Sequence, residues 1–323
     1  FPLARAHNAT SALPAAIDPL LRLFLVQRAH ADAPLATAGG AWRPCDTNSA
    51  RDFSAVGYFF GRDLRAARGV PVGLIGTHWG GTPAEAWTHH DLLEQHPTLV
   101  SLLTNHARAV ANWDPEKAKA SYREQQARWS NEVAKARAEG REPPGGPRLA
   151  TDPKTSAQRP SGLYNAMIAP LVPYAIRGAT WYQGESNASR AQEYETLLPV
   201  MIGGWRQDFG VGDFPFLLVQ IASYQGQPPA IREAQRQIAL KTKHTAMVVS
   251  ADWGEEKDIH PTHKEPVGQR LALAARDLAY GEDVEFSGPV VVKAKAAGNR
   301  AVLTFDECDG GLVARGGALK LFD

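Results

Sequence analysis

A histidine with an acidic residue two positions before it stands in a polar loop, and a proline follows it at once. The pair is Asp258 and His260. A carboxylate so placed can hold an imidazole in one tautomer and stabilise its protonated form, which leaves the other ring nitrogen free as a general base. A structural hydrogen bond explains an isolated Asp-x-His pair equally well. We therefore take His260 as the candidate base and Asp258 as its orienting acid, with His263 as alternative base and Asp252 or Glu255 as alternative acid.

A pair of glycines, Gly80 and Gly81, follows a short apolar stretch. Because glycine lacks a Cβ, the backbone N–H groups there can approach a ligand closely. Thr82 and Glu85 have the spacing of a capping box, which predicts that a helix begins directly after the glycines and adds positive partial charge. The pattern predicts an oxyanion hole or an anion cradle, with a tight strand-to-helix turn as the simpler alternative. Trp79, beside the glycines, is a candidate substrate contact.

A third polar group follows another apolar stretch and comprises Gln183, Glu185, Ser186 and Asn187. The amide of Gln183 can donate an N–H to a developing oxyanion. Glu185 can orient a neighbour through a buried hydrogen bond. Ser186 or Asn187 can cap the next helix, so the simpler alternative explains the last two residues but leaves Gln183 and Glu185 unexplained.

A base and an oxyanion hole require a nucleophile, and Ser186 is the one serine that the sequence places at a strand end. A nucleophile elbow has the form G-x-S-x-G, but here its last position is Ala188, which would crowd the sharp turn. Cys45 lies in a predicted loop and Cys308 in a predicted β segment, so neither is better placed. Ser186 therefore remains a runner-up nucleophile.

Short apolar stretches alternate with amphipathic ones along most of the chain. Strands are predicted at 22–26, 70–77, 179–182, 214–221 and 245–250, and helices at 54–69, from 82, at 114–139, from Tyr194 to Trp205, at 232–240 and at 264–278. Repeated strand-then-helix units form parallel sheets with helices on both faces. Ligands of such sheets lie beyond the carboxyl ends of the strands, where all three polar groups fall. The fold is thus predicted to be α/β.

Two regions depart from this alternation. Residues 105–160 carry a long charged helix and a proline- and glycine-rich loop, and we interpret them as a helical insertion. From about residue 285 the pattern is β-like with no helix between the strands, which predicts a C-terminal antiparallel β segment.

The composition excludes several classes of protein. The chain has 323 residues, 44% hydrophobic and 21% charged, with a net charge of +1, so charge alone attracts it neither to nucleic acid nor to a membrane surface. No apolar stretch is long enough to span a bilayer. Two cysteines cannot form a disulfide framework. The ten histidines invite a zinc interpretation, but His89 and His90 are adjacent and no HExxH-type helix is present, so we expect no metal and no cofactor.

Four segments together resemble the sialate O-acetylesterase family, a branch of the SGNH hydrolases. They are residues 73–87, 159–171, 181–187 and 258–261, and the resemblance extends from residue 1 to about residue 283. It implies a flavodoxin-like three-layer α/β/α fold with a central parallel sheet, no metal, and removal of O-acetyl groups from sugars through a serine acyl-enzyme. It also implies an acetylated carbohydrate as partner and a secreted or periplasmic location, with the cytoplasm as the alternative.

Carried over by motif, the resemblance gives His260 the role of general base and Asp258 that of its orienting carboxylate. Gly81 and Gln183 would supply the oxyanion donors, and Glu185 would lie beside the site. Gly80, Trp79 and Asn187, with Glu185, are the candidate substrate-binding residues.

The sequence departs from the family in two places. Relatives carry Asn where this chain has Gly76. In addition, the family's nucleophile lies in a Gly-Gln-Ser-Asn-Met block just ahead of a segment like residues 1–3, and that block is absent. We therefore expect residues 1–283 to form an esterase domain whose first strand and nucleophilic serine lie on an upstream segment or another chain. Residues 284–323 are expected to begin an accessory β-sandwich layer.

Three other interpretations remain open. The chain could be a non-catalytic module that binds acetylated glycans, with Trp79, Trp181 and Tyr182 stacking on sugars, although these aromatics suit a core equally well. It could be an esterase that uses Ser186, or a metal-dependent hydrolase.

Overall fold

Two three-stranded sheets form the centre of the protein. The structure is a computed structural model that describes residues 1–313 apart from 173 and 309. One sheet has the order β2-β1-β3 and the other β4-β5-β6. The strands are β1 (Asp18–Leu25), β2 (Trp42–Cys45), β3 (Val72–Gly76), β4 (Ala179–Trp181), β5 (Phe216–Val219) and β6 (Thr245–Val248). All pairs are parallel except β1 with β2. The α/β prediction is confirmed, and β2 is an antiparallel edge strand that the sequence analysis did not predict.

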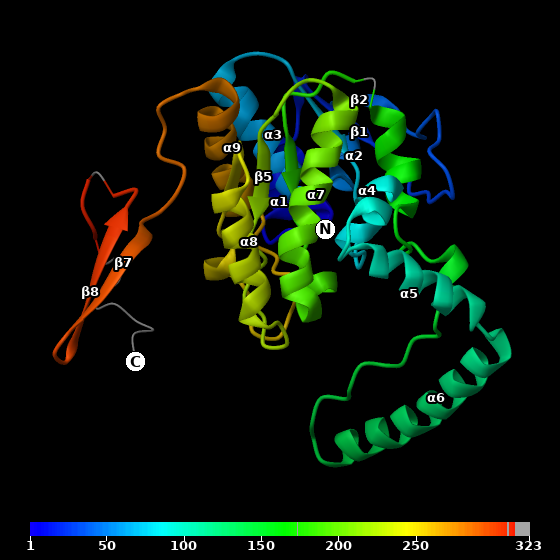
Figure 1. The fold of residues 1–323 in the computed structure, drawn as a ribbon. Helices are drawn as coiled ribbons and strands as arrows, with labels where there is room; N and C mark the ends of the chain where they lie inside the picture. The colour runs from blue at the N-terminus through cyan, green and yellow to red at the C-terminus, as the bar shows by residue number, and fades with distance from the viewer. Residues whose placement is uncertain (173, 309, 314–323) are drawn as a thin grey trace.

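Nine α-helices are assigned in the described residues. They are α1 (Ala9–Ala15), α2 (Thr47–Arg51), α3 (Ala55–Arg68), α4 (His90–Gln95), α5 (Val100–Ala111), α6 (Pro115–Ala138), α7 (Ala191–Phe209), α8 (Pro229–Lys241) and α9 (Glu265–Tyr280). Figure 1 shows α7 and α8 side by side along the strands. No helix in the described ranges combines the length and the apolar character that crossing a bilayer requires.

The side chains of β5 show the three layers directly. Leu217 and Val219 join a buried cluster with residues of α3 and α9, whereas Phe216 and Leu218 join a second cluster with residues of α7 and α8. Successive side chains of a strand point to opposite faces of its sheet. The strand is therefore covered by helices on both faces, and all four of its residues are buried. This arrangement confirms the predicted α/β/α layering.

The third helix, α3, begins and ends where the sequence predicts. The Ser54 hydroxyl accepts a hydrogen bond from the Gly57 N–H at 3.1 Å, which satisfies one of the free donors of the first turn. Gly69 follows with φ 64°, the left-handed conformation that glycine adopts without a steric penalty. The helix therefore stops directly before the segment that leads into β3.

The prediction that a helix begins at Thr82 is wrong. Residues Ala84–Trp87 form a single 3-10 turn, η2, without a side-chain cap, and the chain becomes helical again only at His90. The Thr82 hydroxyl donates to the Trp79 carbonyl at 2.6 Å instead of capping a helix. The Glu85 side chain has stronger partners elsewhere, so the capping box does not form.

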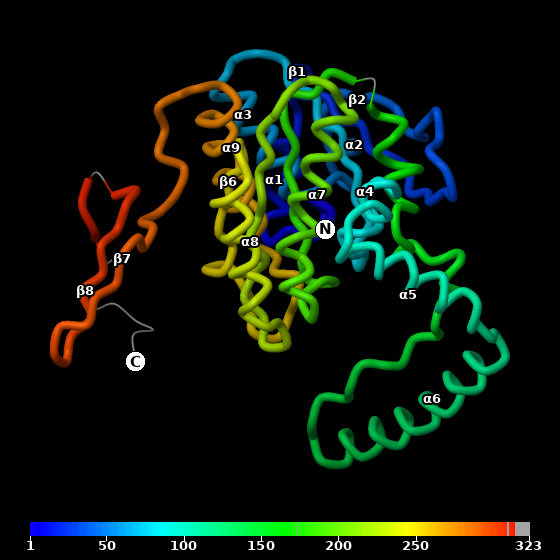
Figure 2. Tube along the Cα trace, in the orientation of Figure 1, coloured from blue at the N-terminus to red at the C-terminus, as the bar shows by residue number. Residues whose placement is uncertain are grey.

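The insertion predicted at 105–160 contains most of α5 and all of α6. Figure 1 and Figure 2 show α6 projecting away from the sheets, with an extended segment returning beside it. Trp129 anchors that return by donating from its indole nitrogen to the Pro144 carbonyl at 2.8 Å. The long charged helix and its stop at Gly140, which has φ 66°, are confirmed.

The C-terminal β segment is a hairpin of β7 (Val290–Ala297) and β8 (Arg300–Asp306). The two strands pair antiparallel, as predicted. Most of their residues are exposed, and Figure 1 shows the hairpin apart from the helices and sheets. Residues 314–323 of the expected accessory layer lie outside the described part of the chain.

Candidate active site

Two strand ends that come from different sheets are tied together by one asparagine. Asn187 has no exposed surface, and its side-chain oxygen accepts from the Ala84 N–H at 2.9 Å and from the Gln183 amide at 2.7 Å. Ala84 begins η2, which follows β3, whereas Gln183 follows β4. The sequence placed Asn187 against the substrate, but in the structure this side chain orders the two segments on which the predicted oxyanion donors stand.

A buried ion pair completes this connection. Glu85, 6% exposed, accepts from the Asn187 amide at 2.9 Å and from the Arg190 guanidinium at 2.6 Å. Charged hydrogen bonds of this kind are stronger than neutral ones, and a buried carboxylate needs such partners. We call Gln183, Asn187, Glu85 and Arg190 the buried network. It joins η2 to η6 (Glu185–Arg190), the 3-10 segment that follows β4.

The amide of Gln183 is fully engaged in this arrangement. Its nitrogen donates to the Asn187 side chain and, at 3.3 Å, to the Thr82 carbonyl, while its oxygen accepts from the Tyr194 hydroxyl at 3.1 Å. An amide nitrogen has two hydrogens, so both are used within the protein. Gln183 therefore braces the site in the structure, and its predicted donation to an oxyanion remains a prediction.

Gly81 retains a free donor. Gly80 and Gly81 are both exposed, and in the described part of the chain the Gly81 N–H donates to no protein group. Gly81 has φ 77°, which disfavours any residue with a Cβ, and its carbonyl accepts from the Gln158 amide at 2.9 Å. An ordered loop with a free N–H suits the predicted donor role.

Trp79 packs near two basic groups of the segment that follows β1. The Arg28 guanidinium lies 5.8 Å from its ring centroid, and the His30 ring lies 6.4 Å away. The Trp79 side chain is partly exposed. It remains a candidate substrate contact.

The predicted base and its acid stand on a loop between β6 and α9. The side chains of Asp258 and His260 are 55% and 67% exposed, and the His260 Nδ1 lies 3.7 Å from the Asp258 Oδ1. The same carboxylate oxygen accepts from the His260 backbone N–H at 2.8 Å. The two side chains are thus adjacent but beyond hydrogen-bonding distance. Catalytic hydrogen bonds are often long before substrate binds.

The alternative acids are both committed to other partners. Asp252 forms two hydrogen bonds with Arg270, at 2.6 and 2.7 Å, and this pairing lowers the pKa of its carboxyl group. Glu255 accepts from the Thr262 N–H at 3.0 Å, which closes the loop. Asp258 is therefore the acid that remains beside His260.

The alternative base, His263, is enclosed by other rings. It stacks on His7 with ring centroids 4.0 Å apart and on Trp253 with centroids 5.0 Å apart. These ring contacts engage His263, whereas His260 lies beside Asp258, which favours His260 as the base.

Glu185, after β4, interacts electrostatically with the predicted base. Burial is the largest influence on its carboxyl group and raises the pKa, whereas the charges of Lys264 and of a protonated His260 lower it. The charge of a group after β6 thus acts on a carboxyl group after β4.

No described serine or cysteine side chain hydrogen-bonds to His260. Ser186 lies in the first turn of η6 and forms no side-chain hydrogen bond with any described residue. Ser223 and Ser250, the other serines near these strand ends, donate to the carbonyls of Ala251 and Gln220. Among the described residues, no nucleophile is therefore paired to the predicted base.

Gly76 has a local explanation. A Cβ at this position would lie 2.8 Å from the Phe53 ring and 3.0 Å from the His78 ring. No other side chain, including the Asn of the family pattern, fits without displacing these rings. The aromatic packing at the end of β3 thus replaces a polar contact.

Sequence reasoning missed three residues that position the site. Tyr194 is predicted only to lie on the apolar face of its helix, but its hydroxyl also donates to the side-chain oxygen of Gln183. The Gln235 amide donates to the Gln183 carbonyl at 2.9 Å. Lys264 was expected only to begin a helix, yet it is 5% exposed. The available signal for Gln235 was a polar residue among Ile231, Ala234 and Ile238 on a helix face that should be apolar.

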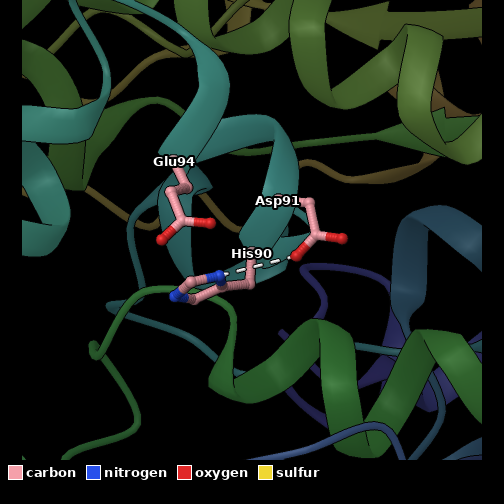
Figure 3. Close-up of side chains that lie close together, drawn as sticks. All are labelled: His90, Asp91 and Glu94. Atoms are coloured by element: carbon pink, nitrogen blue, oxygen red, sulfur yellow. Dashed lines mark ion pairs between the residues drawn. The ribbon is translucent and has the colours of Figure 1, made fainter.

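A separate group of possible metal ligands lies at the start of α4. Figure 3 shows His90, Asp91 and Glu94 facing one another, with the His90 Nδ1 3.7 Å from the Asp91 carboxylate. All three side chains are exposed. The group follows η2 closely in the sequence and does not include His89.

Comparison with known proteins gives consistent matches. Residues 151–277 match the family described as carbohydrate esterase, sialic acid-specific acetylesterase. The chain is 31% identical to the sialate O-acetylesterase of Rattus norvegicus over 89% of its length and to that of Homo sapiens over 77%. A crystal structure of a carbohydrate acetylesterase from Xanthomonas citri superposes with a TM-score of 0.73 and 34% identity over 95% of this chain.

The matches cover only part of the relatives. The chain spans 56% of the rat protein, 44% of the human protein and 60% of the Xanthomonas citri chain. The resemblance predicted from the four sequence segments is confirmed, and it extends to the three-dimensional fold.

Proposed function

Because this chain is related to the sialate O-acetylesterases, we propose that it is part of a carbohydrate O-acetylesterase. The observation that supports the proposal is that the candidate residues Gly81, Glu185 and His260 each follow a strand of the parallel sheets, namely β3, β4 and β6. In this mechanism His260 removes a proton from a serine hydroxyl, which attacks the acetyl carbonyl. Asp258 stabilises the resulting imidazolium, and the Gly81 N–H stabilises the oxyanion. The tetrahedral intermediate then collapses, His260 gives its proton to the sugar oxygen, and the deacetylated sugar leaves. Water, deprotonated by His260, attacks the acyl-enzyme, which releases acetate and restores the serine hydroxyl.

We place the nucleophilic serine on a segment outside residues 1–323. Among the described residues, β3 forms one edge of its sheet and β4 forms one edge of the other, and Gly73 and Thr180 on these two strands are exposed. A parallel strand between them would pair with both edges and end at the level of Gly81 and Gln183. Unpaired edge strands inside an α/β protein are costly, which supports this placement.

Hydrolysis of p-nitrophenyl acetate tests both the proposed esterase activity and the proposed place of the nucleophilic serine. The protein is assayed as residues 1–323 and as a chain extended by the residues encoded ahead of Phe1. We expect activity in the extended chain alone, and we expect its loss when the serine of that extension is changed to Ala. Equal activity in both forms would overturn the placement and implicate Ser186, which Ser186→Ala then checks.

A glycan-binding role without hydrolysis is the second candidate, and the missing nucleophile in the described residues favours it. In that case the extended chain would retain an acetylated glycan without releasing acetate. Loss of activity in EDTA would instead indicate the metal-dependent alternative.

We further propose that residues 284–323 begin a separate β layer and that the protein is secreted or periplasmic. The exposed hairpin supports the first statement, and a chain ending at residue 283 should unfold at the same temperature as the full chain. The second statement rests on the family resemblance, and fractionation of the source cells tests it.

A further inference from the structure

We propose that Lys264 is a positioning residue, whose buried ammonium group holds the end of β4 and the loop of Asp258 and His260 in their active arrangement. This inference rests on the proposed function, because it assigns Lys264 to the same site. Nothing in the sequence motifs or in the relatives' descriptions gives this residue a role.

The first observation is the burial of the ammonium group between three segments. Lys264 is 5% exposed, whereas lysine is normally among the most exposed residues. Its Nζ donates to the Tyr182 hydroxyl at 3.3 Å and lies 4.8 Å from the centroid of the Tyr182 ring. The Phe1 ring covers another side at 5.1 Å. The cation is thus enclosed by aromatic faces, which attract it.

The second observation is the charge around this cation. Carboxylates of Glu185, after β4, and of Glu255 and Asp258, on the loop, all favour its charged form. These carboxylates belong to two segments, the end of β4 and the loop, so the one buried cation attracts both. Removal of the cation would take this attraction away from both segments.

Glu185 connects this arrangement to the base. Burial raises the pKa of the Glu185 carboxyl, whereas Lys264 and a protonated His260 each lower it. Lys264 thus favours the ionised form of Glu185. An ionised Glu185 would stabilise the imidazolium that forms when His260 takes the proton of the nucleophile. Lys264 thus acts through Glu185 and the loop, without touching the substrate.

The test measures the titration of Glu185 directly. Carboxyl ¹³C NMR is recorded on wild-type protein, Lys264→Met, Lys264→Arg and Lys257→Met, with Glu185→Gln to assign the signal. We expect the pKa of Glu185 to rise by about one unit or more in Lys264→Met, since burial is then opposed by one cation fewer. Lys264→Arg restores a cation and should stay close to wild type. Lys257 is exposed on the same loop, so Lys257→Met is the matched control.

A second readout links the titration to activity in the extended chain. We expect Lys264→Met to lower kcat by about tenfold or more with little change in KM, and the acidic limb of the pH profile to move with Glu185. An unchanged Glu185 titration in folded Lys264→Met overturns the proposal. If that variant does not fold, the uncharged Lys264→Gln carries the same expectations. If even the wild-type protein is inactive, the proposed function fails while the NMR titration still decides the role of Lys264.

Discussion

Gln183 and Asn187 lie in a buried network that joins the ends of two sheets, whereas Asp258 and His260 stand on a loop with more than half of each side chain exposed. Every polar group described in the network has a partner within the protein. The acid and base are 3.7 Å apart, and exposed ion pairs at such distances contribute little stability.

This difference separates two kinds of residue in one site. The buried network is held by hydrogen bonds between the segments after β3 and β4. The loop of the predicted acid and base is held by the His260 backbone N–H on Asp258 and by the Thr262 N–H on Glu255. Substitutions in the network should therefore change stability, and substitutions on the loop should change catalysis.

The largest expected effect is that of His260→Ala. In the extended chain we expect kcat to fall by about 10⁴-fold or more, because removal of a triad member leaves only binding and oxyanion stabilisation. The free energy of unfolding should change by less than about 0.5 kcal/mol, as for other exposed positions. Steady-state hydrolysis and urea unfolding measure the two quantities. A mild loss of kcat, with a large loss in His263→Ala, would transfer the role of base to His263.

Asp258→Asn should follow with a loss of about 100-fold or more in kcat, because the amide no longer stabilises the imidazolium. The carboxylate is partly exposed, so solvent replaces some of its effect. Asp252→Asn is the comparison variant and should break the pair with Arg270 without a comparable loss of kcat. The opposite ranking of the two variants would make Asp252 the orienting acid.

Asn187→Ala should mainly lower the free energy of unfolding, whereas the loop substitutions should mainly lower kcat. It leaves the Ala84 N–H and one Gln183 hydrogen without acceptors and removes a donor from Glu85, all in a buried setting. Unsatisfied buried groups of this kind cost about 2–4 kcal/mol in total. Urea unfolding measures the loss, and Asn131→Ala on the exposed face of α6 is the control. A loss no larger than that of the control would show that the network does not hold the two segments.

The smallest effect expected is a pH dependence of stability due to Lys264. Burial lowers the pKa of this ammonium group from 10.5 to about 8. The unfolded chain then binds more protons between pH 8 and 10.5, so wild-type stability rises with pH across that window. The contribution is on the order of 2–3 kcal/mol at most. Relative to Lys264→Met, wild type should therefore be least stable below pH 8 and should recover towards pH 10.5. A difference that is constant with pH would mean that the ammonium group is not buried.

The sequence predicted more of the regular elements than of the contacts between them. Ser54, Gly69 and Gly140 mark helix ends through local preferences, so α3 and α6 were placed within a residue or two. The Thr82 and Glu85 spacing failed because Asn187 and Arg190, about a hundred positions away, compete for Glu85. A local pattern contains no information about such distant partners.

The same limit applies to the site. Its candidate residues were found because polar groups follow apolar strands, and the sequence placed Gly81, Gln183, Asp258 and His260 at strand ends. Whether a residue such as Gln183 or His260 lies in the buried network or on the exposed loop depends on side chains from α7, α8 and η2. The faces of these elements meet only when the protein packs.

The sequence by itself determined the α/β alternation, the residue types at the strand ends and the relationship to carbohydrate esterases, because periodicity and motifs are local properties. The tertiary structure decided that Asn187 joins Gln183 to η2, that the Gly81 N–H has no partner among the described residues, and that Lys264 is buried beside Tyr182. The physical reason is that burial and partner choice depend on segments far apart in the chain, which come together only when the two sheets and their helices pack.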